Sequence, residues 1–196
     1  MQRYAVFHIA GLSVVAAGLF SPSVSRAVPP QPEYSLTERA TAPNGSSTVK
    51  VYVSGEKSRV EILDPGRESI MINLPGKTWF LNPAKRTAFA MPNHFDKTDN
   101  APPSANPCLR HKDWTCTLLG TEAVAGRPAV KWRIQAPNGD GPHRSREMLE
   151  WRDAQYHLPL KQVWGKHSMT ISDLHWGPQP PGLFKVPSGY RVMNSQ

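Results

Sequence analysis

Short segments in which apolar and polar residues alternate recur along the chain. Between Ala129 and Gln135, the residues Val130, Trp132 and Ile134 fall on alternate positions, with a lysine and an arginine between them. Side chains along a strand point to opposite faces in turn. The pattern therefore predicts a strand of an antiparallel sheet with one apolar face and one wetted face.

Other segments have a similar pattern and are separated by turn sequences such as Asn44-Gly45 and Pro75-Gly76. Most of them start roughly 8–12 residues apart, a spacing typical of a sandwich or a barrel. The residues from Thr121 to Ala125 are expected to form a short strand or a turn. The predicted strands are 34–42, 49–53, 60–62, 70–74, 78–81, 87–91, 148–153, 159–164 and 168–174.

Composition agrees with a mainly β protein. The chain contains 20 prolines and 14 glycines and has few long helix-forming stretches, which argues against an α-rich fold.

The first 27 residues resemble a secretory signal peptide. The apolar stretch from Ala5 to Phe20 is shorter than the ~20 residues that usually span a bilayer, and Ser25-Arg26-Ala27 places small residues where a signal peptidase reads them. We expect cleavage after Ala27, export to the periplasm and no membrane-spanning segment. Residues 28–196 are expected to form one domain.

The net charge is +8, and it falls to +6 if Arg3 and Arg26 leave with the signal. The positive charges are spread along the chain, which favours a soluble basic surface over nucleic-acid binding. An exported protein would also meet anionic lipid head groups or polysaccharide before nucleic acid. We therefore expect no nucleic-acid partner.

The two cysteines, Cys108 and Cys116, are predicted to form a disulfide, because the inferred compartment is oxidising. The stretch from Pro92 to Asp113 ahead of them is proline-rich and has no alternating pattern. Loops of this length are commonly functional lids or flexible segments. We expect a loop or short-helix lid between Pro92 and Cys116, anchored by the disulfide.

The sequence offers no catalytic constellation. Its six histidines beyond the signal are scattered, with no spacing typical of a metal site, and no nucleophile elbow or phosphate loop is present. Glu147 and Glu150 would lie on opposite faces of their strand. We expect no enzyme activity, no metal and no cofactor.

Five tryptophans lie on predicted strands or at their ends, and they allow two interpretations. They either fill a closed core or line an open apolar cavity that holds a hydrophobic ligand. The pattern alone leaves both open. These residues are Trp79, Trp132, Trp151, Trp164 and Trp176.

Two motifs resemble the LolA/LolB-like periplasmic lipoprotein carriers. One is Gly76-Lys-Thr-Trp-Phe-Leu-Asn-Pro83, and the other is the tail Leu183-Phe-Lys-Val-Pro-Ser-Gly-Tyr-Arg-Val192. The stretch from Leu119 to Trp132, with Glu150–Leu160 after it, resembles the exported proteins of the DUF4412 group. The carriers begin with an amphipathic helix and have lid helices, for which this chain has no clear counterpart.

The resemblance implies a mainly β (α+β) fold: a strongly curved antiparallel sheet forming an incomplete barrel whose concave apolar face accepts acyl chains. We expect a non-enzymatic carrier for a lipoprotein acyl chain or another hydrophobic envelope ligand. The alternative is a sensing or scaffolding module that binds an envelope protein through the same sheet. The residues expected on the ligand-binding face are Val51, Val53, Val60, Ile62, Ile70, Ile72, Trp79, Leu81, Val130, Trp132, Ile134, Leu149, Trp151, Met169 and Ile171.

Overall fold

The computed structural model describes residues 33–93, 103–109, 111–137, 144 and 146–193. The predicted signal peptide and residues 94–102 of the predicted lid lie outside these ranges. The described residues form twelve strands and a short 3₁₀ helix, η2, at Pro181–Phe184. The strands are β1 (Tyr34–Ala42), β2 (Gly45–Ser54), β3 (Lys57–Ile62), β4 (Ser69–Leu74), β5 (Lys77–Asn82), β6 (Thr87–Pro92), β7 (Thr115–Val124), β8 (Arg127–Gln135), β9 (Glu147–Asp153), β10 (Pro159–Trp164), β11 (His167–Trp176) and β12 (Arg191–Met193).

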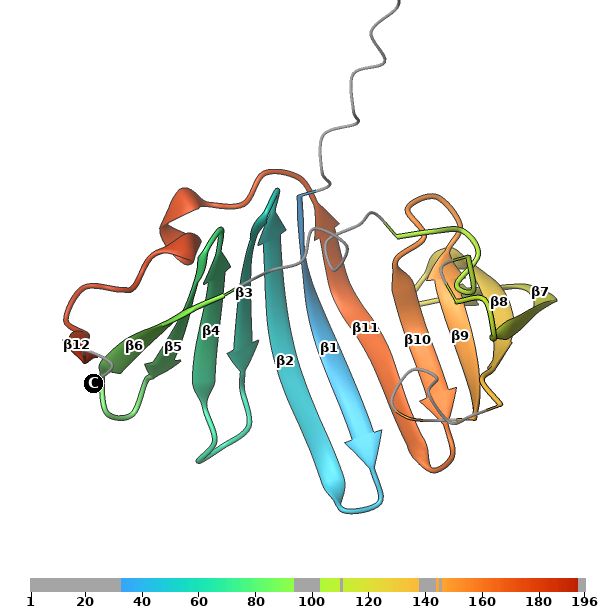
Figure 1. The fold of residues 1–196 in the computed structure, drawn as a ribbon, viewed down its shortest axis with the longest axis horizontal. Coiled ribbons are helices and arrows are strands. Elements are labelled where there is room, and N and C mark those ends of the chain that lie inside the picture. The colour runs from blue at the N-terminus through green and yellow to red at the C-terminus, as the bar shows by residue number, and fades with distance from the viewer. Residues whose placement is uncertain (1–32, 94–102, 110, 138–143, 145, 194–196) are drawn as a thin grey trace, which may run out of the picture.

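All twelve strands belong to one sheet in the order β12-β6-β5-β4-β3-β2-β1-β11-β10-β9-β8-β7 (Figure 1). The pairs are antiparallel except for β12, which lies parallel to β6. The edge strands β12 and β7 lie at opposite ends of the sheet. The sheet is therefore open, as predicted, but it is not strongly curled (Figure 1), so the predicted strong curvature of a half-barrel is wrong.

The predicted strand meander is confirmed from β1 to β6 and from β8 to β11, with small shifts at strand ends. Tight turns join neighbouring strands, and Gly76 between β4 and β5 has φ of +76°, which a glycine adopts without strain. Two features differ from the prediction. The segment expected as a short strand or turn near Thr121 is the second half of the ten-residue strand β7, and the C-terminal β12 was not expected.

Register defines two faces of the sheet, because residues directly opposite on antiparallel strands point to the same side. We call them the Leu36 face and the Ile72 face. On the Ile72 face, Ile72, Leu81 and Ala88 form a buried cluster with Phe184 of η2. The C-terminal segment thus covers this face over β4–β6, and Leu183, Val186 and Tyr190 also pack there.

Arg59 on β3 holds this segment in place. Its guanidinium Nη1 donates a 3.0 Å hydrogen bond to the carbonyl oxygen of Leu183, and its Nε contacts the carboxylate of Glu61 at 2.5 Å. Arg59 is buried. The C-terminal segment is therefore fixed by a charged hydrogen bond as well as by apolar packing.

Two further clusters lie over the other half of the sheet. One contains Val124, Ala129, Trp151 and Leu160, and includes side chains of the Ile72 face. The other, on the Leu36 face, contains Leu36, Leu158 and Ile171. Among the described residues there is no α-helix, so a short-helix lid is not seen in residues 103–109 or 111–114.

Candidate functional site

The fifteen residues expected on one ligand-binding face lie on both faces of the sheet. Their placement follows from the strand register. The Leu36 face carries Val51, Val53, Val60, Ile62, Val130, Trp132, Ile134, Met169 and Ile171. The Ile72 face carries Ile70, Ile72, Trp79, Leu81, Leu149 and Trp151.

The register of β3 and β4 explains the division. Val60 lies opposite Met71, so Ile70 and Ile72 point to the other side. The sequence of β4, Ser-Ile-Met-Ile-Asn-Leu, is apolar at both alternate sets of positions. A period-two argument therefore cannot choose the face, and only the pairing with β3 does.

The predicted residues on the Ile72 face are largely core residues. Ile72 is fully buried, Leu81 is 3% exposed and Trp151 is 5% exposed. Ile72 and Leu81 pack under the C-terminal segment. On this face the packed-core interpretation of the sequence fits the structure better than an open cavity.

The Leu36 face has a different character over β1–β6. An apolar side chain occupies the same level on seven neighbouring strands, and each lies directly opposite the next. We call these residues the apolar row: Leu36, Val51, Val60, Met71, Phe80, Phe89 and Met193.

The apolar row is partly open to solvent. Leu36 is buried, the next four residues are half-buried, and Phe89 and Met193 are 38% and 42% exposed. The rings of Phe80 and Phe89 stack with centroids 5.2 Å apart. Strands lie about 4.8 Å apart, so seven of them give the row a length of about 29 Å. That is about twice the thickness of one leaflet of a bilayer's hydrocarbon core.

A row of polar side chains borders the apolar row on one side. Ser58, Asn73 and Thr78 lie opposite one another on β3, β4 and β5. Asn73 donates to the Ser58 hydroxyl at 2.9 Å and accepts from the Thr78 hydroxyl at 2.9 Å. Asn93 donates to the same Thr78 oxygen at 2.8 Å, while its own amide oxygen is buried without a partner among the described residues. The apolar row thus has a hydrogen-bonded polar border.

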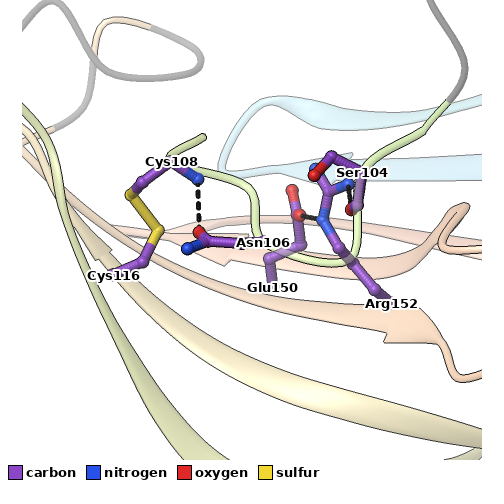
Figure 2. The surroundings of a disulfide bond; sticks show 6 residues. All are labelled: Ser104, Asn106, Cys108, Cys116, Glu150 and Arg152. Carbon is purple, nitrogen blue, oxygen red and sulfur yellow. Dashed lines mark hydrogen bonds and ion pairs between the residues drawn. A yellow bond between two sulfur atoms is a disulfide. The ribbon is translucent and has the colours of Figure 1, made fainter. Parts of the chain in front are cut away.

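On the other half of the Leu36 face, the segment 103–109, which we call the disulfide loop, lies over Arg152 of β9 (Figure 2). Cys108 and Cys116 form the predicted disulfide. Beneath the loop, Arg152 on β9 forms an ion pair with the buried Glu150, which also accepts a 2.6 Å hydrogen bond from Gln162. The guanidinium of Arg152 also donates to the carbonyl oxygen of Ser104. Over β9, this half of the face is therefore covered by a loop and a buried ion pair.

Two acidic groups in the β7–β9 half of the sheet have pKa values lowered by their partners. Burial alone would raise the pKa of Asp153, but hydrogen bonds from Arg127 and from the N–H groups of Tyr156 and Gln155 outweigh it. The indole N–H of Trp151, followed by Lys131, lowers the pKa of Glu122. Both carboxylates therefore serve as acceptors that hold neighbouring strands and turns.

In the part of the chain that the structure describes, no group of three or more His, Cys, Asp or Glu side chains is placed to hold a metal ion. Within the same residues, no helix has the length and apolar character needed to cross a bilayer.

The site residues that the sequence missed are Leu36, Met71, Phe80, Phe89 and Met193. The pairing of β4 with β3 places Met71 on the Leu36 face, and the pairing of β5 with β4 places Phe80 there; the sequence pattern contains neither pairing.

Comparison with known proteins gives a fold likeness and no family. No protein-family model matches the sequence, so the DUF4412 resemblance gains no support, and no curated protein matches it. A LolA superfamily protein of Nitrosomonas europaea is 14% identical over 81% of this chain and 91% of its own. Its TM-score of 0.33 is too low to carry an argument.

Two solved structures are more similar. An uncharacterized conserved protein of Thermus thermophilus has a TM-score of 0.58 and 12% identity, covering 84% of this chain and 91% of its own. A chain of the Pseudomonas aeruginosa MucA/MucB complex has a TM-score of 0.58 and 17% identity, covering 84% of this chain. The match spans only 59% of that longer chain. At these identities the chain is similar to both proteins in fold alone.

Proposed function

We propose that this protein is an exported, non-enzymatic binding protein that holds an acyl chain, a lipoprotein lipid or another hydrophobic envelope ligand along the apolar row. The observation that carries the proposal is the contrast between the two faces of β4 and β5. Both faces are apolar, but the C-terminal segment covers Ile72 and Leu81, whereas Met71 and Phe80 remain half-buried.

The shape and the border of the row fit an amphiphile. Contiguous apolar surface that stays open to solvent is typical of an interaction site. The row is long enough for a single acyl chain, and the polar border at Ser58, Asn73 and Thr78 runs beside it, next to where a ligand's polar end would lie. The disulfide is typical of proteins of the cell envelope or the exterior. In this proposal residues 28–196 form the functional domain.

A titration with a fluorescent fatty acid tests the proposal. The delipidated protein is expected to bind it saturably, and the double substitution Met71→Gln with Phe89→Gln is expected to weaken binding at least about tenfold, since each polar side chain removes apolar contact area. The matched control is Thr115→Gln with Thr117→Gln, on the Ile72 face of β7 and outside the row, which should bind as the unaltered protein does. Absence of both saturable binding and copurified lipid would overturn the carrier proposal.

A second candidate is an envelope sensing or scaffolding module that binds a protein. It is favoured by the edge strand β7, whose Leu118 and Leu119 are 58% and 40% exposed, and by the likeness to a chain that is itself part of a protein complex. An edge strand offers unpaired backbone groups to an added strand. Recovery of a stoichiometric protein without lipid in a pull-down from envelope extract would favour this candidate over the carrier.

A further inference from the structure

The lysines and arginines of the sheet are distributed unevenly between its faces. Of the eleven on the twelve strands, only Arg152 and Arg191 of β12 lie on the Leu36 face, and Arg152 forms an ion pair there with Glu150. The nine on the Ile72 face are Arg39, Lys50, Lys57, Arg59, Lys77, Arg127, Lys131, Arg133 and Lys161. One face of the sheet therefore carries most of the cationic side chains of its strands.

Four of these cations form a line across the middle of the Ile72 face. Lys131 and Lys161 lie opposite Trp151 from its two neighbouring strands, and Thr170 links Lys161 to Arg39. Lys50 lies on β2, the strand next to β1, opposite Thr37 and so two residues away from the level of Arg39. Lys131, Lys161 and Arg39 are each two strands apart, which is about 10 Å. We call Lys131, Lys161, Arg39 and Lys50 the basic strip.

Two positions of the strip are fixed by an aromatic ring. The ammonium groups of Lys131 and Lys161 lie 4.7 Å and 4.6 Å from the centre of the Trp151 ring. Cation–π contacts of this length hold an ammonium group in place without neutralising its charge. The strip is therefore partly preorganised.

Within the described residues, the acids on this face form an ion pair with one of the strip's four cations, and Glu122 also interacts electrostatically with Lys161. Glu122 pairs with Lys131 at 3.1 Å, and Glu61, which lies opposite Lys50, is bound to Arg59 instead. Within the described residues, no ion pair is formed by Arg39, Lys50 or Lys161. Arg39 and Lys50 are exposed.

We propose that the basic strip is a docking surface for anionic lipid head groups at a membrane surface. Cations about 10 Å apart on an open sheet are too widely spaced to converge on one small anion, but they match a plane that presents many anions. Next to the strip lies a hollow of about 190 Å³ lined by Ser35, Thr37, Lys50 and His175, together with Asp173. The hydroxyl groups and the Lys50 ammonium are donors for a lipid phosphate, whereas the Asp173 carboxylate opposes one.

Vesicle flotation tests this proposal. The purified protein is expected to float with vesicles of phosphatidylcholine and phosphatidylglycerol, but not with phosphatidylcholine alone, and to be released by high salt. Each lysine or arginine near an anionic surface contributes about fivefold to binding, so the triple substitution Arg39→Gln, Lys50→Gln and Lys161→Gln should weaken it about a hundredfold.

The matched control removes the same charge from exposed lysines outside the strip. The variant Lys85→Gln, Lys112→Gln and Lys166→Gln should lose much less vesicle binding than the strip variant. Equal losses in the two variants, or equal binding to neutral vesicles, would overturn the proposal. Binding of soluble polyglutamate without binding of anionic vesicles would also overturn it, and would indicate an acidic protein as the partner.

This proposal does not depend on the proposed ligand of the opposite face. The strip variant should bind the fluorescent fatty acid normally, and the Met71→Gln, Phe89→Gln variant should float normally. Failure of one experiment therefore leaves the other interpretable.

Discussion

The guanidinium Nη1 of Arg152 donates a 2.7 Å hydrogen bond to the carbonyl oxygen of Ser104, which lies 48 residues earlier in the chain. The same side chain neutralises Glu150, whose side chain is 3% exposed. One arginine thus anchors the disulfide loop and keeps a buried carboxylate paired (Figure 2).

Removal of this arginine should be strongly destabilising. Arg152→Met leaves the carboxylate of Glu150 buried without its cation, and we expect the free energy of unfolding to fall by about 3–5 kcal/mol. Urea denaturation measures it. The double variant Glu150→Gln with Arg152→Met should lose less than the single variant, since no charge is left buried. A loss below about 1 kcal/mol in Arg152→Met would contradict a buried pair.

The disulfide should contribute less to the free energy of unfolding than the Arg152–Glu150 ion pair does. Replacement of Cys108 and Cys116 by serine opens a short loop, and the chain-entropy estimate gives a loss of about 2–3 kcal/mol in the free energy of unfolding. Urea denaturation with and without a reductant measures this. The reductant should have no effect on the double serine variant, and an equal effect on both proteins would show that it acts elsewhere.

Neighbouring residues on β4 test the register. Ile72→Ala should lower the free energy of unfolding by about 2–5 kcal/mol, because it leaves a cavity under Phe184. Met71→Ala, one residue away on the open face, should cost clearly less, because its side chain is only half-buried. Equal losses, or the reverse order, would contradict the assignment of the two faces.

The contribution of Asp153 to the free energy of unfolding should be lost in acid. The pKa of this carboxyl is lowered in the folded protein, so its contribution is present above the unfolded value of about 3.9 and is lost as pH falls through the lower folded pKa. The difference in free energy of unfolding between the unaltered protein and Asp153→Asn should therefore be largest near neutral pH and shrink below about pH 4. A difference that stays constant with pH would contradict this assignment.

The sequence predicted the strands well but not the faces of all of them. Val130, Trp132 and Ile134 alternate with polar residues, so their common face is evident from the period of two. In β4 and β5 both sets of positions are apolar, and the assignment of Ile72 and Trp79 to the same face as Val60 could not be checked without the pairing of β3 with β4.

The local sequence pattern also could not predict that the C-terminal segment covers the Ile72 face. Phe184 and Tyr190 pack on β4–β6 from more than 90 residues away in the chain, and the contact of Arg59 with the carbonyl of Leu183 spans 124 residues. An alternating pattern indicates that a face is apolar. It does not indicate whether a distant segment covers that face. Such coverage decides which apolar residues form the core and which form the apolar row.

Photo-crosslinking locates the bound ligand directly, with the crosslinking residue at Met71, in the middle of the apolar row, and in a second variant at Thr115, on the Ile72 face of β7. Each folded variant is irradiated with a labelled fatty acid and analysed by mass spectrometry. We expect a fatty-acid adduct at position 71 and none at position 115. An adduct at position 115 alone, or at neither position, would contradict the proposal that the apolar row holds the ligand.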